Sequence, residues 1–457
     1  MARMNPEEKR TFMLSTPIAR LIPNMALPSI AAMLVTSAYN LADTFFVSKL
    51  GTYATGAVSV NSAIDSIIMM AGSLLAVGAA SFSSRLLGAK EDEHAKCVVS
   101  TSFFLTFCMG LAVLIFGNLF RDPLLRLLGA TEALLPYSRD YCRYILLAAP
   151  FMASSFALNQ CLRAEGSAMF SMVGMVTGAI LNIGLDPIFI FSFGWGVAGA
   201  SAATAISKFV SWCILITPYI RKKTLLTISL KYFKPNWPDL SEICAVGLSS
   251  FLRNALSTFA AVVLNRIAVG FGESVLAAVS VSNRITMFMT AACLGYGQGF
   301  QPVAGFSWGA KRYDRLREAN RFAMQSCVIG ISLAALLVGI FAEPLLLLFT
   351  ESDAEMIRVG VFSLRSQCLA MPFHGYCIIV SMLCAGIGRA RAAAVLGVSR
   401  QGICFFPILP LLVWGFGRWG VACVQGVGDV LSMVPALIIA RKVAKEVREL
   451  EKNALNH

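Results

Sequence analysis

The stretch LGTYATGAVSVNSAI (Leu50 to Ile64) returns later in the chain as FGESVLAAVSVSNRI (Phe271 to Ile285). The two stretches align without gaps, and their residue numbers differ by 221 throughout. At the same spacing, LLGAKEDE (Leu86 to Glu93) aligns with SWGAKRYD (Ser307 to Asp314). Two matches at one spacing indicate that the chain consists of two homologous halves, as in many membrane transporters.

Apolar runs long enough to cross a membrane recur along the whole chain. Hydrophobic residues make up 57% of the 457 residues and charged residues only 14%, whereas soluble proteins contain about 25% charged residues. A spanning helix needs about 20 apolar residues. The apolar runs and their charged breaks predict helices at 15–46, 54–82, 97–119, 134–162, 168–192, 197–219, 243–269, 275–304, 324–349, 359–386, 392–416 and 419–440. We therefore expect an all-α polytopic membrane protein with twelve transmembrane helices in two homologous six-helix bundles.

Six predicted helices separate the two repeats, so both repeats begin on the same side of the membrane. Such parallel repeats are related by an axis along the membrane normal, and the substrate site lies between the halves. We predict an N-lobe at 1–220, a basic linker at 221–240, a C-lobe at 241–440 and a tail at 441–457.

Basic residues gather in alternate loops, for example at 221–223, 311–321 and 441–448. Positive loops mark the cytoplasmic side of a membrane protein. The net charge of +13 is therefore explained by topology rather than by nucleic-acid binding. Both termini are predicted to be cytoplasmic.

Three acidic residues lie within apolar helices of the first half: Asp43, Asp65 and Asp186. An ionisable group inside a membrane is a functional-site hypothesis by default. Asn182 lies four residues before Asp186 and therefore shares its helix face. Together with a hydroxyl such as that of Thr204, these oxygens suit Na⁺ or a shared proton. The alternative is that each Asp caps a helix end or faces water.

The second half has no acid at the equivalent positions, which favours an ion site in the first half only. Polar and methionine residues of both halves are candidates for a substrate cavity between the lobes. Within this cavity we expect Arg284 to lie near Asp65. The candidate cavity residues are Asn61, Asp65, Met69, Arg284, Met287, Gln298 and Gln301.

Catalytic and nucleotide-binding signatures are not found in the sequence. It has no GxxxxGK[ST], GxSxG or HExxH motif, and its three histidines have no metal-ligand spacing. The expected protein is not an enzyme and needs no cofactor besides a coupling ion.

Several motifs resemble the multidrug and toxic compound extrusion (MATE) family, especially its bacterial multidrug-pump branch. They are DTFFVSKLG from Asp43, RAEG ending at Gly166, LNIGLDPIFIF from Leu181, GVAGASAAT from Gly196, and GQGFQPVAGFSWGAKRYDRLREA from Gly297. The resemblance covers essentially the whole chain, and the order and spacing of the motifs make it specific.

This resemblance implies a V-shaped, outward-facing pair of bundles in the bacterial plasma (inner) membrane. It implies export of small organic, often cationic compounds in exchange for Na⁺ or H⁺. The cation site of the family falls on Asp43, Asn182, Asp186 and Thr204, and a further ligand falls on Asn159. The acid pair that another branch places in the seventh and tenth helices is absent from this sequence.

Two other functions remain open at this point. A flippase or exporter of lipid-linked saccharides, or of a specific metabolite, would share the two-lobed shape but needs a more basic cavity. A membrane receptor or scaffold would need sizeable soluble segments. As partners we expect small organic cations and membrane lipid, no nucleic acid, and a monomeric protein.

Overall fold

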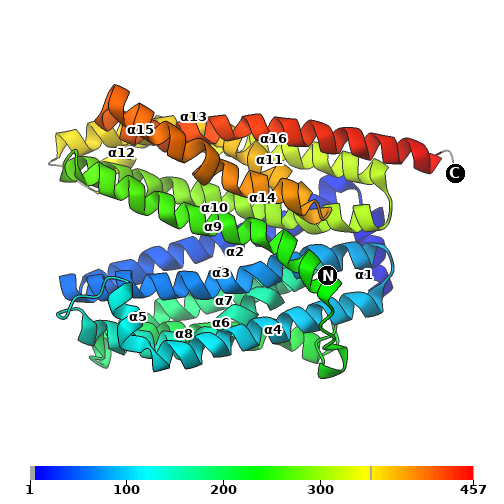
Figure 1. Cartoon of the computed structure of the whole chain (residues 1–457), viewed down its shortest axis with the longest axis horizontal. Helices are drawn as coiled ribbons and strands as arrows, with labels where there is room; N and C mark the ends of the chain where they lie inside the picture. Colours follow the sequence, from blue (N-terminus) through cyan, green and yellow to red (C-terminus); the bar gives the residue numbers. More distant parts are fainter. Residues whose placement is uncertain (1–5, 350–352, 456–457) are drawn as a thin grey trace.

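The computed structural model describes residues 6–349 and 353–455, and this part of the chain is almost entirely helical, with no strand (Figure 1). The N-lobe helices are α1 (Pro6–Ser15), α2 (Ile18–Ser48), α3 (Thr52–Gly88), α4 (Asp92–Leu119), α5 (Arg121–Leu127), α6 (Leu135–Ala164), α7 (Ala168–Pro187) and α8 (Gly196–Ile220). The C-lobe helices are α9 (Trp237–Val269), α10 (Glu273–Gly309), α11 (Tyr313–Ile340), α12 (Ala342–Leu347), α13 (Ala354–Gly386), α14 (Ala390–Val398), α15 (Phe405–Phe416) and α16 (Arg418–Leu455). Short turns are π-helical in η1 (Ile188–Ser192) and η3 (Ser399–Cys404), and 3₁₀ in η2 (Leu230–Tyr232).

Within the described residues, twelve helical segments are long and apolar enough to cross a membrane. This confirms the predicted all-α polytopic fold. Two predicted helices differ most from the structure: 324–349 is observed as Tyr313–Ile340, and 419–440 as Arg418–Leu455. In both cases the helix continues through residues rich in Arg and Lys. A helix satisfies its own backbone hydrogen bonds and can extend into water, so an apolar run underestimates its length.

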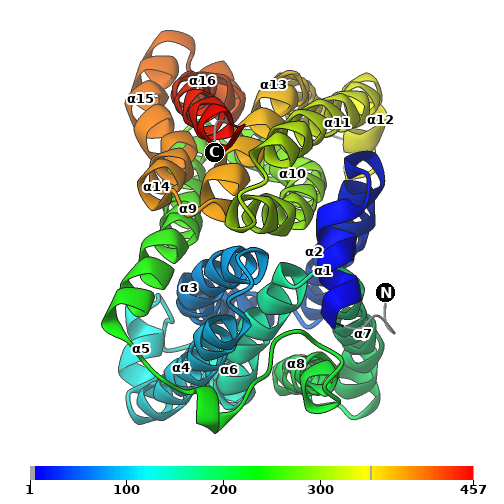
Figure 2. The same ribbon diagram turned by 90° about the vertical axis from the view of Figure 1, so that its right-hand side faces the viewer.

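The helices form two bundles, which Figure 2 shows end-on, with α3 to α8 below and α9 to α16 above. The first spanning helix, α2, lies at the side of the molecule and packs against both α7 and α10. Most of the other contacts between the bundles are made by α3, which packs against α9 and α10. Two helices of each sequence half therefore make most of the contacts that join the lobes.

The bundles meet closely at the end of the molecule that carries both termini. A Cβ atom added to Gly309 of α10 would overlap the carbonyl oxygen of Arg85, and one added to Gly88 of α3 would overlap that of Phe306. These two contacts are equivalents of each other, because 88 and 309, like 85 and 306, differ by the repeat spacing of 221. Only glycine at both positions lets the two helix ends cross this closely.

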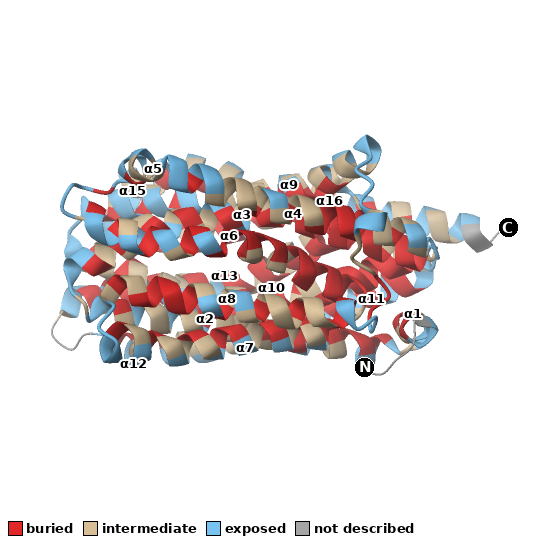
Figure 3. Ribbon diagram, turned by 90° about the horizontal axis from the view of Figure 1, so that it is seen from below, coloured by how far each residue is buried: buried red, intermediate tan, exposed pale blue. Residues whose placement is uncertain are grey.

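The opposite end of the molecule is open. Gly51 and Gly272 begin α3 and α10 there, and a Cβ at either position would meet nothing within 4 Å. Almost every residue of α3 from Gly72 to Gly88 is buried. In the first half of the same helix, buried residues alternate with more exposed ones. Figure 3 shows the same gradient, with buried residues concentrated toward the end that carries the termini. The two bundles thus form the V-shaped arrangement expected from the sequence.

A buried ion pair fastens the closed end. Lys9 of α1 donates from Nζ to Ser167 Oγ at 2.8 Å and lies 3.4 Å from Oε1 of Glu165, in the turn between α6 and α7. The other oxygen of Glu165 accepts from the backbone amides of Leu225 and Leu226, at 2.8 and 3.2 Å, in the segment between the lobes. Burial raises the pKa of Glu165, and the Lys9 ammonium opposes that rise. One carboxylate therefore connects three segments that are far apart in the sequence.

We predict that Glu165→Ala lowers the free energy of unfolding by about 3–5 kcal/mol, because it leaves the ammonium of Lys9 buried without a partner of opposite charge. The effect should be measured as the thermal unfolding midpoint of the purified protein in detergent. Glu132→Ala, which removes one partner of an exposed ion pair with Arg126, is the control and should change little. Equal midpoints for the two variants would contradict the prediction.

Candidate cation site and cavity

The carboxylate of Asp186 lies one helical turn after Asn182, near the end of α7. Both side chains are buried, with 0% and 2% of their surfaces exposed. Pro187 follows directly and has no N–H group, so α7 loses one backbone hydrogen bond and widens into the π-helical turn η1. Local sequence thus places the carboxylate of Asp186 where the regular α-helix ends and the π-helical turn begins.

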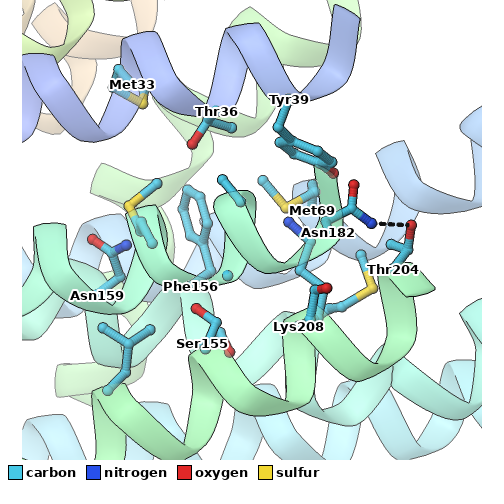
Figure 4. Close-up of a pocket in the computed structure, with 17 residues that line it drawn as sticks. Met33, Thr36, Tyr39, Met69, Ser155, Phe156, Asn159, Asn182, Thr204 and Lys208 are labelled. Atoms are coloured by element: carbon cyan, nitrogen blue, oxygen red, sulfur yellow. Dashed lines mark hydrogen bonds between the residues drawn. The ribbon is translucent and has the colours of Figure 1, made fainter. Parts of the chain in front are cut away.

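The amide of Asn182 connects α7 to α8. In the orientation that satisfies all its neighbours, Nδ2 donates to Asp186 Oδ2 at 3.1 Å. Its oxygen then accepts from the backbone amide and the hydroxyl of Thr204, at 3.3 and 3.2 Å. Figure 4 draws the other orientation of this amide, in which its nitrogen points toward the hydroxyl of Thr204. A carboxylate, an amide and a hydroxyl are thereby held together, which is the oxygen-rich set predicted from the sequence.

Asp43 reaches the same region from α2. It interacts electrostatically with Asp186, and its Oδ1 atom is buried without a hydrogen-bond partner. An unpaired buried carboxylate oxygen is costly unless a cation or a proton satisfies it. Two carboxylates, one on α2 and one on α7, that interact electrostatically suit the uptake of one positive charge.

A cavity opens beside these residues within the N-lobe, with a volume of about 220 Å³. Figure 4 shows its walls: Met33, Thr36 and Tyr39 of α2 face α6 and α8 across the space. Asn159 of α6 also lines it and accepts a hydrogen bond from Ser171 at 2.7 Å. Drug-sized ligands occupy about 300–1,000 Å³. The cavity therefore holds part of such a ligand unless the bundle widens.

Lys208 of α8 is a functional candidate that the sequence reasoning missed. It lies one turn after Thr204, lines the cavity, and interacts electrostatically with Asp43 and Asp65. The signal was available in the sequence, because a lysine within an apolar helix is as exceptional as an aspartate there.

The residues predicted for a cavity between the lobes lie in different surroundings. Asn61 is fully buried in the N-lobe, and its amide donates to the carbonyls of Ala57 and Ser138 at 2.9 and 3.2 Å. Met69 and Met287 are each 40% exposed. Gln298 and Gln301, both on α10, have side-chain atoms that are buried without a partner.

Asp65 and Arg284 do not form the expected pair. Arg284 is exposed on α10 and makes no ion pair within the described residues. The cation that acts on Asp65 is Lys208 instead. Asp65 therefore interacts electrostatically with residues of the N-lobe, Lys208 and Asp43.

Among the described residues of the C-lobe, one acid is buried, and it is already neutralised. Asp429 of α16 is 1% exposed and accepts two hydrogen bonds from the guanidinium of Arg400, one of them at 3.3 Å. Its Oδ1 atom also lies 3.2 Å from Nδ1 of His374. The charge of a carboxylate held this way is already compensated by the guanidinium, so it attracts a free cation far less strongly. Elsewhere in the described residues, no group of three or more His, Cys, Asp or Glu side chains is placed to bind a metal ion.

We predict that Arg400→Met destabilises the protein by about 3–5 kcal/mol, because it leaves the carboxylate of Asp429 unpaired in the bundle. Adding Asp429→Asn should restore much of the lost stability, since the charge is then removed as well. Thermal unfolding in detergent measures both variants. A double variant no more stable than the single one would contradict the assignment of Asp429 as a structural partner.

Two homologous bundles that close at one end, with charged groups buried beside a cavity in the membrane, define a polytopic transporter. Comparison with known proteins specifies it further. The sequence profile of the MatE family matches residues 28–188 and 249–411. The chain belongs to this family of transporters and is not an enzyme.

The relatives match over nearly their full length. The multidrug export protein MepA of Staphylococcus aureus (strain MSSA476) is 28% identical over 436 residues, which cover 95% of this chain and 96% of that protein. A crystal structure of MATE in complex with MaL6 superposes with a TM-score of 0.91 at 27% identity, over 97% of this chain and 99% of that one. A structure described as the outward-facing conformation of a multidrug resistance MATE family transporter superposes with a TM-score of 0.89 at 27% identity. The match covers 99% of this chain and 98% of that one.

Proposed function

We propose that this chain is a secondary antiporter that exports small organic, often cationic compounds in exchange for Na⁺ or H⁺. The observation that carries the proposal is the difference between the lobes. In the N-lobe, Asp43 has a buried oxygen without a partner beside Asp186, whereas the buried acid of the C-lobe is paired with Arg400. The names of the relatives, which include multidrug export proteins, support the choice of cargo.

In this mechanism the coupling cation enters from the open end and binds between Asp43 and the group of Asn182, Asp186 and Thr204. Helix α2 transmits the change. Its first part is fixed, because Ala26 and Ile30 contact Gly299 and Gly295 of α10 closely enough to exclude any side chain there. Beyond Pro28, which interrupts its hydrogen bonding, α2 carries Tyr39 and Asp43 and can bend as the cation binds. The cavity then changes shape and releases its cargo.

We infer that the closed end is cytoplasmic and that the protein lies in the bacterial plasma membrane. The basic loops 221–223 and 311–312 lie at this end with both termini, in agreement with the charge rule for cytoplasmic loops. One chain contains both lobes and the proposed site, so a monomer would suffice for transport.

Export from proteoliposomes tests this function. The purified protein should be reconstituted with ethidium, and a Na⁺ gradient and a proton gradient should be imposed separately. Efflux is expected under at least one gradient, and the gradient that works identifies the coupling ion. No efflux under either gradient would reject the antiporter.

A flippase for lipid-linked saccharides is the alternative, and the cavity argues against it. Its lining is mainly methionine, aromatic and small polar side chains, with Lys208 as its charged member. An anionic lipid-linked saccharide would need a strongly basic surface.

A further inference from the structure

The ammonium of Lys208 is a positive charge fixed inside a cavity that is proposed to bind cations. Of the residues that line the cavity, all within the described chain, Lys208 is the one that carries a charge. Its Nζ atom lies 5.0 Å from the ring centroid of Tyr39, so it crosses from α8 toward α2. The ring face attracts the ammonium and holds it there.

Two carboxylates interact electrostatically with this ammonium, and neither forms an ion pair with it. Asp43 of α2 and Asp65 of α3 both interact with Lys208 electrostatically, and each has a buried Oδ1 atom without a hydrogen-bond partner. Lys208 makes no ion pair within 4.0 Å in the described part of the chain. The ammonium is therefore held by the side chain of Tyr39 rather than by a carboxylate, and it lines the cavity that a ligand would enter.

This arrangement affects different ligands in opposite ways. A ligand with only positive charge must compete with Lys208 for Asp43 and Asp65, and a tethered group has a high effective concentration. A ligand with a carboxylate beside its amine can pair with Lys208 and with an aspartate at once. The apolar wall, which includes Met33, Met152 and Phe156, accepts a flat or flexible apolar body in either case.

We propose that Lys208 is a specificity-determining residue that makes the N-lobe cavity prefer zwitterionic amphiphiles, which carry both an amine and a carboxylate, over purely cationic ones. This inference rests on the proposed export function, because it assumes that the cavity receives cargo. It does not depend on which coupling ion drives export, since the charged group that acts on Asp186 is Asp43, whereas Lys208 acts on Asp43 and Asp65.

Binding measurements on the purified full-length protein in detergent test the inference without a gradient. The probes are ethidium, a permanent cation, and norfloxacin, which carries an amine and a carboxylate. Lys208→Met removes the charge but keeps a long apolar side chain, and Lys208→Arg keeps the charge as the matched control. For Lys208→Met we expect ethidium to bind about tenfold more tightly and norfloxacin about tenfold more weakly, each a change of about 1.4 kcal/mol. Lys208→Arg should stay within about twofold of the original protein for both probes.

The opposite signs separate specificity from a structural role. If Lys208→Met changes both affinities in the same direction, or neither, the inference is wrong. Lys208→Gln provides the same test if the methionine variant fails to fold. If the original protein binds neither probe, the proposed cargo class fails, and this inference fails with it. Loss of gradient-driven efflux with intact binding of both probes would reject the antiporter but leave the role of Lys208 standing.

Discussion

Asp186→Asn is expected to reduce cation-driven efflux to the level of liposomes without protein, while the protein still inserts and folds. Asparagine keeps the shape of the side chain and can still hydrogen-bond to Asn182. It cannot be ionised, so it neither binds Na⁺ as a charge nor takes up and releases a proton. If Asp43 and Asp186 share one cation, Asp43→Asn should have the same effect.

The matched control is Asp140→Asn, the same substitution at an exposed acid on α6 of the same lobe. Its efflux should equal that of the original protein. Initial rates of ethidium export from proteoliposomes, normalised to the amount of inserted protein, give the comparison. Full efflux by Asp186→Asn would remove the N-lobe site from the coupling mechanism. Full efflux by Asp43→Asn alone would leave Asp186, Asn182 and Thr204 as the complete cation site.

Most of the fold could be predicted because lipid imposes a simple rule on the sequence. Backbone N–H and C=O groups in a bilayer must form their hydrogen bonds within a helix, so each long apolar run predicts one helix. The repeat at a spacing of 221 residues then reveals two homologous bundles. The rule fails at helix ends such as Arg418–Leu455, where charged residues continue a helix outside the apolar layer.

The residues of the candidate site could be predicted only where they lie close together in the sequence. Asn182 and Asp186 share one turn of α7, and the family resemblance adds Thr204 and Asn159. The electrostatic interaction of Asp65 with Lys208, rather than with Arg284, depends on how α3 packs against α8 and α10. The neutralisation of Asp429 by Arg400 likewise joins two helices. A single sequence contains no signal for such contacts, because side-chain partners across helices follow from packing rather than from spacing.

A single added methyl group at the closed end is expected to have the second large effect. In Gly247→Ala, the new Cβ would overlap the carbonyl oxygen of Leu74, because α9 and α3 touch backbone to backbone at this point. Backbone atoms cannot rotate away as a side chain can, so the two helices must separate. Overpacking costs about 1–3 kcal/mol in protein cores. Here the destabilisation affects the conformation with this end closed, because α9 and α3 touch in that conformation.

We therefore expect Gly247→Ala to disfavour the conformation that is open at the end opposite the termini, and to abolish efflux by preventing the closed end from sealing. Spin labels at Glu93→Cys and Asp314→Cys, repeat-related exposed positions at the closed end, should report a longer distance in this variant, in a background without native cysteines. Gly330→Ala is the control, because a Cβ there meets nothing within 4 Å, and it should leave both distance and efflux unchanged. An unaltered distance in Gly247→Ala, together with normal efflux, would show that the backbone contact between α3 and α9 is not what closes the transporter. A shorter distance would be equally incompatible with the overlap, since the added atom can only push the two lobes apart.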